Sequence, residues 1–105
     1  MQIVYNKKNI NLNYLNCYVK FFIDENQLFL HNTIYDKKVV LTGSNKDLKK
    51  VLTVLHTGIS ESKFIKVLGN ITSKPKDLYE YLLQNFIVEW GVIYDKRIIK
   101  KIWYW

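Results

Sequence analysis

The stretch LFLHNTIYDKKVVLTG, residues 28–43, decides the expected fold, because strand-like segments end in it and helix-like segments begin directly after it. Its two apolar segments, Leu28–Asn32 and Lys38–Thr42, flank a turn at Tyr35-Asp36-Lys37 and predict a β-hairpin. Upstream, residues Tyr14–Ile23 alternate between two sets of side chains with a period of two, which predicts another strand. Because the connections are short, we expect the three strands to form one antiparallel sheet.

The alternating segment 14–23 also predicts which side chains are buried. One set of its residues should face the core: Leu15, Cys17, Val19, Phe21 and Ile23. Cys17 is therefore expected to be a small buried hydrophobe rather than a nucleophile, since no local base accompanies it. Residues 2–5 and 10–12 are expected to form a small separate hairpin around residues 6–9.

Gly43 ends the predicted sheet, and two helix patterns follow. Ser44 is a suitable N-cap for the first helix, over residues 45–56, and Gly58 is expected to end it. The buried stripe of the first helix comprises Leu48, Val51, Leu52 and Leu55. Ser60 is expected to cap a shorter second helix that ends at Gly69-Asn70. Its inward residues are Phe64, Ile65 and Leu68.

A third helix is expected to begin after Thr72 or Ser73, with Pro75 in its first turn, where a missing N–H costs nothing. Asn85 is expected to end this helix in a left-handed conformation, and residues 86–93 to form a strand. The face of the third helix that should pack on the core carries Leu78, Leu82 and Phe86, and Tyr79 and Leu83 widen it sideways.

Strands that lead into a compact three-helix unit form a winged helix-turn-helix outline. The expected fold class is therefore α+β, a three-stranded antiparallel sheet followed by three helices, with an additional C-terminal strand or tail. At 105 residues the chain is long enough for one domain with one modest core, so residues 1–105 are expected to form a single recognition domain.

The composition favours an acidic partner, because 16 Lys and Arg against 9 Asp and Glu give a net charge of +7. No apolar run approaches the ~20 residues that would span a bilayer, and the first residues lack an apolar signal segment. We therefore expect a cytoplasmic protein. Cys17 is the single cysteine, which excludes a disulfide framework and a thiolate metal cluster.

Catalytic chemistry is not indicated by the sequence. His31 and His56 have no neighbours at metal-ligand spacing, and no nucleotide-binding or nucleophile motif is present. The carboxylates are scattered over turns and helix starts, where capping accounts for them. We expect a protein that is not an enzyme and uses no cofactor or metal.

Duplex DNA is a weak candidate ligand. A DNA-reading helix offers polar and basic side chains to base edges, whereas the third helix offers apolar groups and two acids, Asp77 and Glu80. A winged-helix transcription regulator with its basic tail on phosphate is kept as the second hypothesis. A membrane-surface role is disfavoured, because the lysines and aromatics of the tail do not form clean faces.

An extended peptide fits the sequence better. The predicted strand 38–42 ends the sheet and offers backbone groups to which a peptide can add as a further strand. Tyr79 and Leu83 lie off the centre of the helical stripe and are candidates to contact such a peptide. Lysines near the ends of this region, Lys38, Lys74 and Lys76, favour an acidic peptide.

The run LFLHNTIYDKKVVLTGSNKDLKKVLTVLHTGISESKFIKVLGN, residues 28–70, closing on LYEYLLQNFIVE at residues 78–89, resembles the PqqD-like RiPP recognition element. The resemblance covers roughly residues 14–93. It implies a domain that binds the leader segment of a ribosomally made precursor peptide. It also implies that the domain presents this peptide to a modifying enzyme, such as a cyclodehydratase, dehydrogenase or radical enzyme, in bacteriocin or thiopeptide-type biosynthesis.

The resemblance further implies where the leader binds, as a strand between the third strand and the third helix. Carried over to this sequence, the implied contacts are Lys38, Val39, Val40 and Leu41 on the strand, and Lys76, Tyr79, Leu83 and Phe86 on the helix side. The basic aromatic tail, residues 94–105, extends beyond the family-like part and is expected to pair with residues 86–93. Its possible roles are covering the binding site, dimerisation, or docking the enzyme through Arg97, Lys100, Lys101, Trp103 and Trp105.

Overall fold

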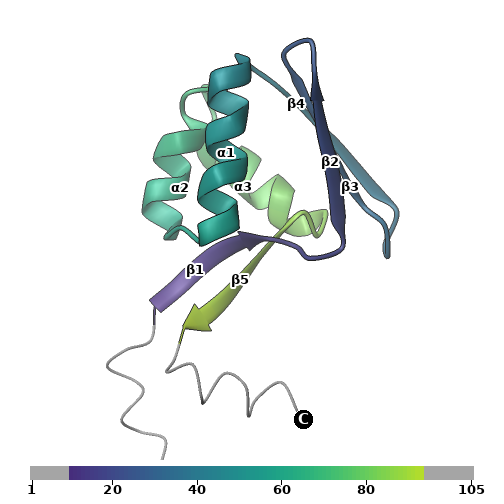
Figure 1. Cartoon of the computed structure of the whole chain (residues 1–105). Coiled ribbons are helices and arrows are strands. Elements are labelled where there is room, and N and C mark those ends of the chain that lie inside the picture. Colours follow the sequence, from purple (N-terminus) through teal and green to yellow (C-terminus); the bar gives the residue numbers. More distant parts are fainter. Residues whose placement is uncertain (1–9, 94–105) are drawn as a thin grey trace, which may run out of the picture.

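The protein has an α+β fold, seen in a computed structural model that describes residues 10–93 (Figure 1). In chain order the elements are β1 (Ile10–Leu15), β2 (Val19–Asp24), β3 (Gln27–Asn32), β4 (Lys37–Thr42), α1 (Asn45–Thr57), α2 (Glu61–Leu68), α3 (Pro75–Gln84) and β5 (Val88–Ile93). The predicted three-stranded antiparallel sheet is confirmed as β2-β3-β4, and three helices and a further strand follow it. The predicted pairing of β5 with the tail lies outside the described residues.

A second sheet joins the two ends of the described chain. β1 and β5 pair antiparallel, with Ile10 opposite Ile93 and Leu15 opposite Val88. Figure 1 shows the helices beside the three-stranded sheet, with the β1-β5 pair across their lower end. Residues 10–12 thus pair with residues 91–93, so the hairpin expected from residues 2–5 and 10–12 is not formed by residues 10–12, and residues 2–5 lie outside the described part.

The segment 14–23 is two strands in different sheets rather than the one predicted strand. β1 ends at Leu15, the chain turns at residues 16–18, and β2 begins at Val19. The side-chain oxygen of Asn16 accepts a hydrogen bond from the Tyr18 N–H at 2.9 Å, and its main-chain carbonyl accepts one from the Val19 N–H at 3.0 Å. These bonds close a tight turn, so the alternation of the two strands is not continuous across it.

This break overturns part of the predicted core. Cys17 lies in the turn and is exposed, and Phe21 on the edge strand β2 is 50% exposed, so both were wrongly expected to be buried. Val19 is buried as predicted.

The predicted caps of α1 are confirmed. The Ser44 hydroxyl accepts a hydrogen bond from the Asp47 N–H at 3.1 Å, and Gly58, at φ 95°, ends α1 and donates its N–H to the Val54 carbonyl. Ser60 is at the N-cap of α2 but makes no side-chain cap bond, and the N-cap of α3 is Lys74 rather than the expected Thr72 or Ser73. The side chains that point inward fill the core between the helices and the sheets. The largest fully buried ones include Leu28, Leu48, Leu55, Phe64, Leu68, Leu82 and Ile87.

The end of α3 differs from the prediction in one residue. Phe86, rather than Asn85, adopts the left-handed conformation, with φ 57° against −96° for Asn85. The Phe86 N–H bonds to the Leu83 carbonyl and the Ile87 N–H to the Leu82 carbonyl, which is the Schellman pattern. We attribute the shift to packing: Ile87 is fully buried, so the burial of its side chain fixes which residue makes the turn.

The exposure of Cys17 can be tested by substitution. Cys17→Ser should change the free energy of unfolding by no more than about 0.5 kcal/mol, because an exposed turn residue loses little contact. Urea denaturation followed by circular dichroism measures this change. A loss well above that figure would indicate that the Cys17 side chain is buried, as the alternation had predicted.

Candidate functional site

The outer edge of β4 is the first candidate site. In the sheet order β2-β3-β4 this strand has one neighbour, and no other strand among residues 10–93 pairs with it. Edge strands present main-chain N–H and C=O groups that a further strand can use.

The register of the two hairpins shows which residues of β4 present these groups. Glu25 and Asn26, both at positive φ, form a two-residue turn between β2 and β3, so the flanking pair Asp24 and Gln27 is hydrogen bonded. Hydrogen-bonded residues then alternate along β3, and its even-numbered residues point their main-chain groups toward β4. The Gly43 N–H bonds to the carbonyl of the even-numbered Asn26 at 3.1 Å, as this alternation requires.

The partners of those even-numbered residues on β4 are Lys37, Val39 and Leu41, whose main-chain groups therefore point inward to β3. The groups of Lys38, Val40 and Thr42 point to the outer edge. A strand added there would be held by these three residues. We call this line of main-chain groups the β4 edge.

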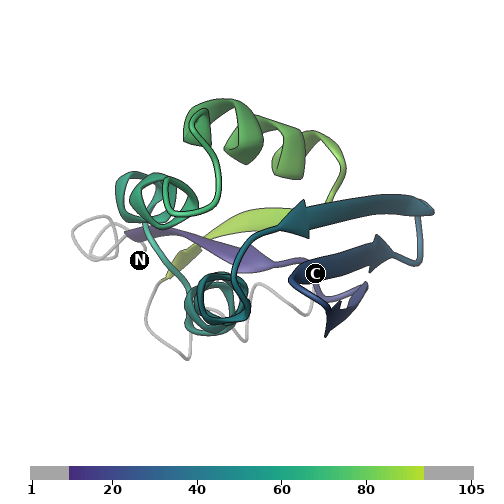
Figure 2. The same ribbon diagram turned by 90° about the horizontal axis from the view of Figure 1, so that it is seen from above.

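Helix α3 runs alongside the β4 edge and is tied to both ends of β4. In the link between α2 and α3, before the helix begins, Ile71 lies so close to Gly43, directly after β4, that a side chain at Gly43 would clash with it at 2.7 Å. At its other end, Phe86 stacks on Tyr35, just before β4, with ring centroids 4.5 Å apart. The helix and the strand are therefore antiparallel neighbours, as both views also show (Figures 1 and 2).

One flank of α3 faces away from β4. The Tyr79 ring packs edge-on against Phe64 of α2, and its hydroxyl donates to Oδ1 of Asn13 in β1 at 2.7 Å. Leu83 lines the same pocket as Asn13 and Trp90. Since Tyr79 and Leu83 point toward α2, β1 and β5, Leu78 and Tyr81 lie on the opposite flank of the helix, and we infer that this flank is the one turned toward β4.

The structure places the predicted contacts on two different surfaces. Lys38 and Val40 are exposed on β4, and Phe86 is partly exposed beside Tyr35. Val39 and Leu41 are buried in the core. Tyr79 is also buried, so the expectation that it lies on an accessible flank is wrong, and Lys76 and Leu83 share its side of the helix. The expected tail contacts, residues 97–105, lie outside the described residues.

Sequence reasoning missed Leu78 and Tyr81 as neighbours of the β4 edge. Leu78 was assigned wholly to the core, yet it is half-buried, and Tyr81 is 47% exposed. The spacing of three residues between them was a signal that they share a flank. Which flank meets β4 depends on the hydrogen bond of Tyr79 to Asn13, 66 residues away, which no local pattern contains.

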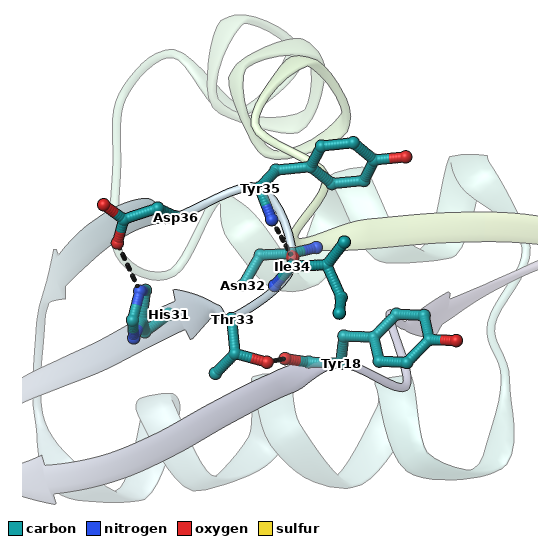
Figure 3. A network of polar contacts seen from close by, with 7 residues as sticks. All are labelled: Tyr18, His31, Asn32, Thr33, Ile34, Tyr35 and Asp36. Carbon is teal, nitrogen blue, oxygen red and sulfur yellow. Dashed lines mark hydrogen bonds and ion pairs between the residues drawn. The ribbon is translucent and has the colours of Figure 1, made fainter.

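The turn between β3 and β4 closes one end of this region (Figure 3). The Asn32 side-chain oxygen accepts hydrogen bonds from the N–H groups of Ile34 and Tyr35 at 3.0 and 3.1 Å. His31 Nε2 and Asp36 Oδ1 are 2.8 Å apart. The hydrogen bond with His31, with the charge of Lys38 second, lowers the pKa of Asp36, so this carboxylate is charged next to two basic side chains.

Two chemical features are absent from the described part of the chain. Residues 10–93 hold no group of three His, Cys, Asp or Glu side chains suited to a metal ion. None of their helices is long and apolar enough to cross a membrane. Comparison with family models, with curated proteins and with solved structures gives no match for this chain.

The role of Tyr79 as a buried tie can be tested. Its burial raises the pKa of the hydroxyl, the charge of Glu61 raises it further, and the bond to Asn13 opposes both, so the folded protein holds the hydroxyl protonated. Tyr79→Phe would leave Oδ1 of buried Asn13 without this donor and should lower the free energy of unfolding by about 1–3 kcal/mol. Urea denaturation measures the loss.

Tyr81→Phe is the matched control, because that side chain lies two residues further along the same helix and is 47% exposed. It should change the free energy of unfolding by less than about 0.5 kcal/mol. Equal effects of the two substitutions would show that the Tyr79 hydroxyl is not a buried tie.

Proposed function

We propose that this protein is a non-catalytic recognition protein, a winged-helix domain of the PqqD-like type that acts in the cytoplasm. It binds the leader segment of a ribosomally synthesised precursor peptide and presents that peptide to a modifying enzyme. The observation that carries the proposal is the position of α3 beside the β4 edge, held at both ends by Ile71 and Phe86. The likeness of residues 14–93 to that family supports it from the sequence side.

The ligand binds in this proposal as a fourth strand. The outward main-chain groups of Lys38, Val40 and Thr42 supply hydrogen bonds that do not depend on the peptide's sequence. Side chains of an added strand alternate between the two faces of the sheet. One set meets the flank of α3 with Leu78 and Tyr81, and the other set lies beside the side chains of Val40 and Lys38.

These surroundings select the leader's composition. Apolar residues suit the set that faces Leu78 and Tyr81, since both side chains offer apolar surface. Acidic residues suit the set beside Lys38, and Lys74 at the start of α3 adds positive charge near one end. An amphipathic, acidic leader therefore fits. Binding it would raise the effective concentration of the attached core peptide near the enzyme.

A proline substitution tests strand addition directly. Val40→Pro removes one outward N–H and leaves the inward bonds to β3 in place, as edge strands tolerate. Fluorescence polarisation of labelled leader peptides, taken from short reading frames next to the gene, should show micromolar or tighter binding to the natural protein. Val40→Pro should weaken it at least tenfold, which corresponds to ~1.4 kcal/mol.

Phe21→Pro is the matched control on the other edge of the same sheet. Phe21 is 50% and Val40 is 49% exposed, and by the same alternation the Phe21 N–H also points out of the sheet. Binding should be unchanged in this variant, and circular dichroism should show that both variants are folded. Equal binding by Val40→Pro and the natural protein would refute strand addition at β4. Binding of a DNA duplex that fades steeply with salt, with no peptide binding, would favour the transcription regulator instead.

A further inference from the structure

The outer face of the β2-β3-β4 sheet carries an exposed aromatic row. The strand register aligns Phe22, Phe29 and Val40 across the three strands, on the face opposite the buried Leu28, Leu30 and Val39. Phe22 is 59% exposed, and no element among residues 10–93 packs over this row. A pocket of about 370 Å³ opens on this face between the row and its neighbours.

The rings of Phe22 and Phe29 stack face to face, so each ring covers one face of the other. Their centroids are 4.6 Å apart and their planes differ by 14°, so they stack in parallel. The more exposed ring, Phe22, lies on the edge strand β2, where a further planar group can continue the stack.

A basic row lies beside the aromatic row. Lys20, His31 and Lys38 are aligned across the same strands, two residues along, and line the same pocket. Two residues of strand correspond to ~6.6 Å. Asp36 is paired with His31 and also interacts with the charge of Lys38, while Asp24 lies beyond the aromatic row on the other side. The face thus combines exposed rings with positive charge on one side.

We propose that this outer face binds single-stranded nucleic acid, with a base stacked on the uncovered face of Phe22, whose ring Phe29 supports, and phosphates next to Lys20 and Lys38. Stacking on aromatic rings beside a basic track requires no particular sequence, since every base has a flat face. The central strand β3 uses its main-chain groups on both sides within the sheet, so a peptide gains no main-chain bonds on this face. The tail, residues 96–105, has the same sign of charge as the lysines, which disfavours it as the occupant.

This site uses side chains on the outer face, whereas the peptide site uses the main-chain groups of the β4 edge, so probes of different chemistry test the two proposals separately. The probes are fluorescein-labelled RNA and DNA single strands of about ten nucleotides with mixed sequence, and the matching duplex. Polarisation with the full chain at low salt should show saturable binding of the single strands and much weaker binding of the duplex. The comparison of RNA with DNA identifies which sugar the site prefers.

Phe22→Ala and Phe29→Ala should each weaken single-strand binding by on the order of tenfold. Lys20→Gln and Lys38→Gln leave the rings in place. Each should reduce the slope of log affinity against log salt concentration by roughly the amount that one phosphate contact contributes. Tyr81→Ala is the control, because this exposed ring lies on α3, and it should bind as the natural protein does.

Four results would overturn the proposal. The first is the absence of single-strand binding by the folded protein, and the second is binding that the Phe22, Phe29 and lysine substitutions leave unchanged. The third is a dimer, seen by light scattering, that Phe22→Ala dissociates, because this result would assign the outer face to a second copy of the chain. An acidic peptide that competes at this face with equal affinity would also overturn the assignment to nucleic acid.

Discussion

The buried side-chain amide of Asn32 is the contact on which the arrangement of sheet and helix depends. It is fully buried at the end of β3 and uses both ends of its amide. Its nitrogen donates to the carbonyl of Phe86 at 2.7 Å, and its oxygen accepts from the N–H groups of Ile34 and Tyr35. One side chain thus shapes the turn into β4 and holds the exit of α3 beside that turn. A buried amide left without these partners would cost more than it contributes, so the two elements are fixed together.

A second buried amide fixes the rotation of α3 about its own axis. Asn13 is 2% exposed, and its nitrogen donates to the Ile59 carbonyl at 3.2 Å while its oxygen accepts from the Tyr79 hydroxyl. The main chains of Asn13 and Ile59 also exchange hydrogen bonds of 2.7 and 3.1 Å. This cluster ties β1, the link between α1 and α2, and α3 to each other. With Asn32 fixing the position of the helix end and Asn13 its rotation, the flank of Leu78 and Tyr81 has one available orientation.

The sequence was sufficient for features that depend on local chemistry. Ser44 and Gly58 bound α1 as caps do, and helical spacing identified the buried positions of α1 and α2. The sequence was insufficient for features that depend on contacts between residues far apart in the chain. Asn16 falls on the outward set of a regular alternation, and only the pairing of β1 with β5 shows that the chain changes sheet at this residue. Asn85 has the better intrinsic propensity for a left-handed turn, yet Phe86 adopts it because Ile87 must be buried.

The same difference between local and distant contacts explains which parts of the site were predicted and which were not. The edge strand and the helix beside it follow from the order of the elements, and were expected from the sequence. The individual helical contacts depend on a rotation set by Asn13 and Tyr79, and on this point the sequence pattern favoured the wrong flank. Aromatic residues on an amphipathic helix can belong to the core or the surface, and the spacing alone does not distinguish a tyrosine with a buried partner from one without.

The β4 edge and the outer face are linked by shared residues. The main-chain groups of Lys38 and Val40 point to the edge, while their side chains stand on the outer face next to His31 and Phe29. A strand added at the edge would extend the outer face, and its side chains opposite Val40 and Lys38 would lengthen the aromatic and basic rows. An acidic side chain of the added strand opposite Lys38 would offset the charge of that lysine. The ligands proposed for the two surfaces would therefore compete through charge without touching the same main-chain groups, and the composition of the peptide would set the strength of this competition.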